Sequence, residues 1–90
     1  MTNALNIQVK ASALKAIVST VNGGKDVASW YGDIIVVATK NPTAEKLMDL
    51  AITALKASGK EWMIDRFQSG HFKKNAIKVE DVFVAFFKIV

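Results

Sequence analysis

The chain has no cysteine, one proline and one histidine among its 90 residues. The absence of cysteine excludes a disulfide framework, a thiolate zinc site and thiol catalysis. With a single histidine, any metal site would have to consist mostly of carboxylates. We therefore expect no metal and no cofactor. A small fold without disulfide bonds also suits the reducing cytoplasm.

Two kinds of apolar segment are missing as well. No apolar run approaches the length that is needed to span a bilayer. The first ten residues alternate polar and apolar side chains and lack the apolar core of a signal peptide. These features predict a cytoplasmic protein that makes no membrane contact.

Length and composition predict a single domain over residues 1–90. Apolar residues make up 51% of the chain and charged residues 22%, which is the balance of a globular domain and not of a disordered one. The sequence contains no internal repeat, no low-complexity tract and no linker that would divide the chain.

Periodicity predicts the elements of the N-terminal half. Residues 5–9 alternate apolar and polar side chains, which is typical of a half-buried strand. Apolar side chains at helical spacing predict a helix over residues 12–22, which ends at the glycines 23–24. Residues 25–33 are predicted to form a loop. The β-branched run at 34–38 predicts a central strand that is buried on both faces.

A second helix is predicted over residues 42–57. Asn41 is a good N-cap, and Pro42 suits the first helical position. An apolar stripe continues at helical spacing to about Ala57, and Gly59 ends the helix.

The C-terminal third allows two interpretations. Residues 60–67 are predicted to be a strand, and a turn at 68–70 connects it to a second strand over 72–79, so that the two form a hairpin. Residues 82–90 are rich in β-branched and aromatic side chains, which favours a last strand. A terminal helix that begins at the acidic residues 80–81 is the alternative.

The predicted order is β-α-β-α-β-β-β, which defines an α+β fold. We expect a two-layer domain in which a mostly antiparallel sheet packs on two helices. The first β-α-β unit would be a right-handed crossover.

The apolar C-terminal segment, residues 82–90, predicts buried surface at the end of the chain. Residues 82–87 are an unbroken apolar run, and only Lys88 interrupts the apolar character before the C-terminus. Such a segment must lie in the chain's own core or against another subunit, since an exposed apolar edge strand invites aggregation. We expect a homo-oligomer, most simply a symmetric dimer.

No stretch of the sequence has the pattern of a catalytic site. The glycines 23–24 follow a predicted helix and precede Lys25 and Asp26, whereas a phosphate-binding loop needs two glycines five apart, followed by lysine and a hydroxyl residue. Ser69 and His71 flank one glycine in a predicted turn, where their side chains rarely converge as a nucleophile and its base. We expect a protein that is not an enzyme.

A basic segment with aromatic residues is the strongest functional signal. The net charge is +4, and basic and aromatic side chains gather around the predicted turn at 68–70. A basic surface beside stacking aromatics is the combination that holds single-stranded nucleic acid. The predicted nucleic-acid-binding residues are Arg66, His71, Phe72, Lys73, Lys74 and Lys78. The alternative is a solvated basic hairpin with Phe67 and Phe72 turned inward.

Three other large aromatic residues allow either a binding role or a place in the core. Trp30 and Tyr31 are candidates for stacking on bases or for contact with a partner, because nearby glycines suggest that the loop projects from the domain. Trp62 is expected in the core.

Two functions follow from these patterns. The first is a small, basic, non-enzymatic protein that binds nucleic acid, prefers single strands and tolerates any sequence. The second is a protein-interaction module, such as an inhibitor, an adaptor or an assembly subunit, that uses the apolar segment at 82–90. An acidic protein surface would suit the positive charge in that case.

Overall fold

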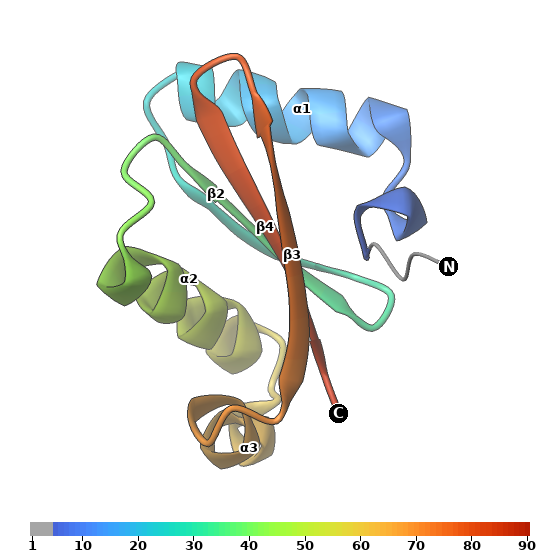
Figure 1. Ribbon diagram of the computed structural model, residues 1–90, viewed down its shortest axis with the longest axis vertical. Helices are drawn as coiled ribbons and strands as arrows, with labels where there is room; N and C mark the ends of the chain where they lie inside the picture. The colour runs from blue at the N-terminus through green and yellow to red at the C-terminus, as the bar shows by residue number, and fades with distance from the viewer. Residues whose placement is uncertain (1–4) are drawn as a thin grey trace.

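The computed structural model describes residues 5–90, which form one sheet with helices around it (Figure 1). The 3-10 helix η1 and the helix α1 precede the first two strands, α2 follows those strands, and the 3-10 helix η2 and α3 lead to the last two. The bounds are η1 Leu5–Gln8, α1 Ala11–Asn22, β1 Val27–Tyr31, β2 Ile34–Thr39, α2 Ala44–Ala57, η2 Glu61–Met63, α3 Ile64–Gln68, β3 Phe72–Val79 and β4 Val82–Ile89.

The sheet consists of two hairpins that lie side by side. Its strand order is β1-β2-β4-β3, and each neighbouring pair is antiparallel. β2 and β4 are therefore the inner strands, and β1 and β3 are the edges. In the central pair, Ile35 lies opposite Phe87 and Val37 opposite Ala85. The predicted central strand at 34–38 is confirmed.

Helices cover both faces of this sheet. On the α1 face, Val18 of α1 packs with Val84 and Phe86 of β4. On the α2 face, Leu55 and Phe67 pack with Phe87. The predicted α+β class with an antiparallel sheet is confirmed. The domain has three layers instead of the expected two, because β2 and β4 are apolar on both sides and each side needs its own cover.

The strand predicted for residues 5–9 is wrong, since Leu5–Gln8 is a 3-10 helix. The backbone N–H of Leu5 donates a hydrogen bond to Oδ1 of Asn75 at 2.7 Å, and η1 therefore caps the face of β3 and adds no strand to the sheet. Leu5 and Val9 still bury their side chains in the α1 face. Without this strand the expected β-α-β crossover does not exist.

The loop predicted for residues 25–33 contains the edge strand β1. Val27–Tyr31 pairs with β2 across a tight turn, in which Gly32 has a φ of +66° that glycine adopts freely. All five side chains of β1 are half-buried, so the strand lacks the alternation of buried and exposed residues by which a sequence pattern is recognised.

Residues 61–67 are helical, so the strand predicted for residues 60–67 is wrong, and so is its hairpin with residues 72–79. η2 and α3 bring Met63, Ile64 and Phe67 onto the core of the α2 face. These residues are spaced by one, three and four positions, which places them on one side of a helix. The hairpin partner of β3 is β4.

The last strand is confirmed, and the alternative of a terminal helix is excluded. β4 is hydrogen-bonded to β2 on one side and to β3 on the other. Val82 and the run 84–86 are completely buried, and Phe87 is 3% exposed. Most of the run 82–87 thus lies in the chain's own core, whereas Val90 at the end of the segment is 54% exposed. A homo-oligomer remains a prediction, but most of the segment from which it was inferred is internal.

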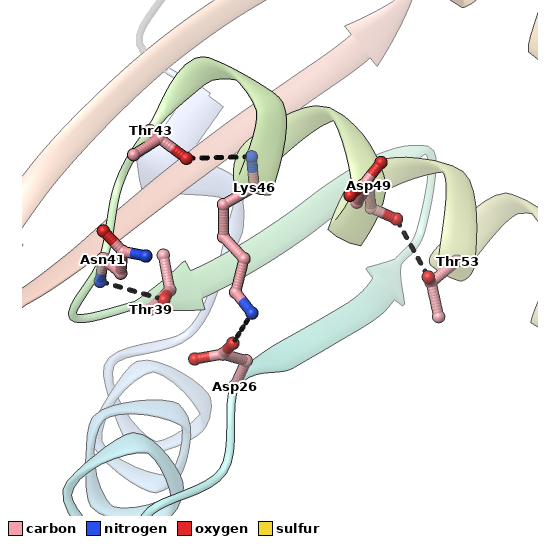
Figure 2. A network of polar contacts seen from close by, with 7 residues as sticks. All are labelled: Asp26, Thr39, Asn41, Thr43, Lys46, Asp49 and Thr53. Carbon is pink, nitrogen blue, oxygen red and sulfur yellow. Dashed lines mark hydrogen bonds and ion pairs between the residues drawn. The ribbon is translucent and has the colours of Figure 1, made fainter.

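α2 is confirmed, although it begins two residues later than predicted (Figure 2). Thr43 is the N-cap, and its Oγ1 accepts a hydrogen bond from the backbone N–H of Lys46 at 3.1 Å. The backbone N–H of Asn41 instead donates to Oγ1 of Thr39 at 3.0 Å. The Nζ of Lys46 lies 2.8 Å from Oδ2 of Asp26 and ties α2 to the start of β1.

Candidate functional site

The edge strand β3 carries three exposed lysines, Lys73, Lys74 and Lys78, which we call the basic edge. Side chains alternate along a strand. Ile77 packs on the α1 face, so Lys73 belongs to that face. Phe72 packs on the α2 face, so Lys74 and Lys78 belong to that one. The basic edge therefore presents positive charge on both sides of the strand.

The acidic residues that form ion pairs do so with other lysines. Three ion pairs occur in the described part of the chain, namely Lys40–Asp81 at 3.3 Å, Lys46–Asp26 at 2.8 Å and Lys88–Asp33 at 3.3 Å. Within residues 5–90 none of the lysines of the basic edge has an ion-pair partner. Their charges are therefore available to an anionic ligand.

Two lysines of the last hairpin lie directly opposite each other. Lys73 of β3 is in register with Lys88 of β4. Like charges in this position destabilise a sheet. The carboxylate of Asp33, in the β1–β2 turn, lies 3.3 Å from the Nζ of Lys88 and offsets part of the repulsion. A second anion near Lys73 would offset the rest.

Arg66 lies in α3 and His71 directly before β3, and both residues are exposed. The backbone N–H of His71 donates to the carbonyl oxygen of Arg66 at 3.1 Å, which closes the turn after α3. Arg66 and His71 thus lie at the end of β3 that carries Lys73 and Lys74, whereas Lys78 lies near the other end of the strand. The hairpin tip on which they were placed does not form, because α3 and a strand flank the turn.

The sixth predicted residue, Phe72, belongs to an aromatic cluster in the core. Its ring centroid lies 4.8 Å from that of Phe67 and 5.5 Å from that of Phe87. Phe67 is 1% exposed and Phe72 is half-buried. This is the inward arrangement that was the alternative in the sequence analysis, and it leaves little of the Phe72 ring for a base.

Trp30 and Tyr31 occupy adjacent positions in β1 and point to opposite faces of the sheet. Tyr31 packs on the α1 face. Trp30 packs on the α2 face, where its Nε1 donates a hydrogen bond to the carbonyl oxygen of Ala54 at 3.1 Å. The Nζ of Lys60 lies 5.4 Å from the Trp30 ring centroid, within the range of a cation–π contact.

The exposed aromatic residue of this region is Trp62, for which the sequence predicted a core position. Its side chain is 70% exposed. The helical turns of η2 and α3 direct Met63 and Phe67 inward and leave Trp62 outside. The helical spacing of the apolar residues was the signal that could have found it, but the strand interpretation of 60–67 hid that spacing.

Trp62 lies at an open hollow of about 200 Å³ where η2, the β1–β2 turn and the end of β4 meet. We call it the indole hollow. Its lining includes the side chains of Trp30, Asp33, Lys60, Trp62 and Lys88. Two indoles and two ammonium groups therefore surround one small space. Lys88 connects this hollow to the basic edge through its neighbour Lys73.

The glycine pair at 23–24 ends α1. Gly23 is the C-cap of α1, and its backbone N–H donates to carbonyl oxygens of that helix. Ser69 and His71 are both exposed. Among residues 5–90 no group of three or more histidine and acidic side chains could hold a metal ion. No helix in the same range is long and apolar enough to cross a membrane.

Comparison with known proteins gives no match: no family model, no curated protein and no solved structure is significantly similar to this chain.

Proposed function

We propose that the protein binds single-stranded nucleic acid without sequence preference and is not an enzyme. The observation that carries this proposal is the basic edge, where three exposed lysines lie on an edge strand that has no acidic residue. Arg66 in α3 adds a further exposed cation, and His71 adds an exposed imidazole directly before β3. Phosphate groups are the ligands that such a row of cations suits best.

The arrangement favours tolerance of sequence. Lysine contacts to phosphates position a strand without reading its bases. The ammonium groups of the basic edge project from both faces of one strand, so a flexible backbone can follow the edge. The exposed indole of Trp62 favours single strands, because stacking requires a base with a free face.

The proposal is tested by fluorescence anisotropy with a labelled oligonucleotide of mixed sequence, in single- and double-stranded form. Three to four phosphate contacts give a slope of about −2 to −3 in a plot of log K against log salt concentration. We expect tighter binding of the single strand at each salt concentration. Absence of binding at low salt for DNA and RNA would overturn the proposal.

A matched pair of variants separates the basic edge from overall charge. One variant replaces Lys73, Lys74 and Lys78 by glutamine. The control replaces three exposed lysines elsewhere, namely Lys10, Lys25 and Lys56. Both lose three charges, but only the first should lose about 2 units of the salt slope. Equal losses would mean that the protein attracts nucleic acid by net charge alone.

A second candidate function is supported by a groove beside the same strand. An open groove of about 420 Å³ runs between α1 and the end of β3, and its apolar side chains come from Ala11, Leu14, Val18 and Val79. The outer edge of β3 has no neighbouring strand among the described residues. An extended acidic peptide could pair with this edge, place apolar side chains in the groove and face the lysines.

An acidic partner suits this edge better than a second copy of the chain. Two copies of β3 in contact would bring lysines face to face, which destabilises the pairing. Ala11→Trp fills the groove from an exposed position and tests the idea. Loss of binding to an acidic, apolar peptide with unchanged oligonucleotide binding would assign the groove to peptides. No peptide binding by the unmodified protein would remove this candidate.

A further inference from the structure

The indole hollow combines two kinds of group that a nucleotide requires. Trp62 offers an exposed flat face, and the ring of Trp30 is held in place by its hydrogen bond to Ala54. Lys60 and Lys88 bring positive charge to the same space. Its volume of about 200 Å³ is below the range of roughly 300–1,000 Å³ of sites for larger ligands, so one ring system is the expected content.

The ammonium group of Lys88 already forms an ion pair with a carboxylate. Oδ2 of Asp33 lies 3.3 Å from its Nζ. A carboxylate offers a lysine the same kind of anionic oxygen as a phosphate does. Asp33 also lines the hollow. An entering phosphate group would therefore compete with Asp33 for Lys88.

We infer that the indole hollow binds one nucleotide unit, with its base stacked on Trp62 and its phosphate on Lys60 and Lys88 in exchange for Asp33. Where a strand supplies the nucleotide, this inference rests on the proposed function and adds a subsite to the basic edge. A free mononucleotide has the same chemistry and is the other source. Stacking involves the π-face that all bases share, which keeps the subsite tolerant of sequence.

The ligand source is determined by tryptophan fluorescence. The unmodified protein is titrated with adenosine 5′-monophosphate, adenosine, inorganic phosphate and a single-stranded oligonucleotide. Quenching by the monophosphate at lower concentration than by adenosine, and none by phosphate, indicates that base and phosphate bind together. Quenching by the oligonucleotide alone assigns the hollow to a strand. No quenching by any nucleotide overturns the inference.

Trp62→Ala tests the stacking platform. Loss of one base–aromatic contact should weaken binding about 5- to 150-fold. The residue is exposed, so the variant should keep the unfolding midpoint of the unmodified protein. Unchanged affinity for both the strand and the monophosphate would overturn the inference and leave the proposed function intact. Binding of the monophosphate without binding of the strand would support the inference and overturn the proposed function.

Asp33→Asn tests the competition, and the chain offers a close control. Asp81 pairs with Lys40 at the same 3.3 Å, and side-chain exposure is similar in the two pairs, 64% for Asp33 and 68% for Asp81. Asp33→Asn should strengthen nucleotide binding up to about fivefold, which corresponds to the loss of an exposed ion pair. Asp81→Asn adds the same charge at the far end of the β3–β4 hairpin and should leave affinity unchanged. Equal gains would overturn the role of Asp33.

Discussion

The two strands of the last hairpin differ sharply although they are paired along their whole length. β4 is an inner strand, and most of its side chains are buried on both faces. β3 is an edge strand with the pattern of half-buried and exposed positions that one open side allows. β4 holds the α1 and α2 faces together, whereas β3 supplies the basic edge. Position in the sheet, and not strand propensity, decides which strand can serve a ligand.

This difference explains why lysine is tolerated on one strand and nearly absent from the other. A lysine in the middle of β4 would have to be desolvated between two helical layers, which is costly without a partner. The one lysine of β4, Lys88, lies at the end of the strand, remains half-exposed and pairs with Asp33. On β3 the lysines also prevent pairing with other edge strands.

The largest effect is expected from the core of β4. Phe86 is completely buried on the α1 face, so Phe86→Ala should lower the free energy of unfolding by about 3–5 kcal/mol. Lys78→Ala on β3 is the control and should change it by less than about 0.5 kcal/mol. Urea denaturation measures both. A similar cost in the two variants would remove the distinction between the strands.

Substitutions of Phe72 test the contribution of β3 to the core of the α2 face. Phe72→Ala should cost about 2 kcal/mol of unfolding free energy, because a half-buried ring and its contacts with Phe67 and Phe87 are lost. Phe72→Leu keeps most of the apolar volume and should cost less. Both folded variants should bind oligonucleotide like the unmodified protein. A stable Phe72→Ala variant with weak binding would restore the role that the sequence suggested for this ring.

Single substitutions on the basic edge test which face of β3 contacts the nucleic acid. Lys73→Gln and Lys74→Gln should each weaken binding of a single strand about fivefold at 0.1 M salt, since one phosphate contact adds about 0.7 to the salt slope. Lys74→Gln should leave the unfolding midpoint unchanged, whereas Lys73→Gln should raise it slightly, because it removes the repulsion with Lys88. An effect of Lys74→Gln alone would place the strand on the α2 face, on the side of the sheet opposite to Lys73 and its neighbour Lys88.

The smallest effect is expected from the ion pair of Lys46 with Asp26. Lys46 is paired, whereas the lysines of β3 are not paired within the described residues. A hydrogen bond from Lys46 lowers the pKa of Asp26 below its ordinary value of 3.8, and Asp26 raises the pKa of Lys46 above 10.5. The ion pair therefore stabilises the folded state at pH values between 3.8 and 10.5. This stabilisation is lost as the pH falls below 3.8 or rises above 10.5.

Lys46→Met should therefore flatten the decline in unfolding free energy below pH 4. Lys78→Met, which removes an unpaired lysine, should leave the acid limb unchanged. Thermal unfolding between pH 2 and pH 7 measures both variants. An identical acid limb in Lys46→Met and the unmodified protein would mean that the ion pair does not contribute to stability.

The sequence predicts the elements that have their own periodicity or strong burial. α1, α2 and the strand at 34–38 follow from apolar spacing, and β4 follows from its β-branched and aromatic residues. The strands predicted for residues 5–9 and 60–67 are wrong because short apolar patterns fit a strand and a helical turn equally well. Their conformation depends on contacts distant in sequence, such as the hydrogen bond from Leu5 to Asn75.

Of the candidate site, the sequence predicts only the positively charged residues. The lysines of residues 73–78 are recognisable as a basic cluster in the sequence, and an exposed strand is their expected place. The indole hollow draws on the β1–β2 turn, η2 and the end of β4, which are far apart in the chain. The pairing of Asp33 with Lys88 depends on the register of two hairpins, which a local pattern does not contain.

The most direct test of the contrast between the strands is an NMR titration of the labelled protein with a single-stranded oligonucleotide. We expect the largest shifts for the lysine side chains of the basic edge and the indole N–H of Trp62, with small shifts for the side chains of Phe86 and Val84 in β4. Shifts confined to the groove at Ala11 and Leu14, or no shift at low salt, would contradict the assignment of the basic edge as the binding surface.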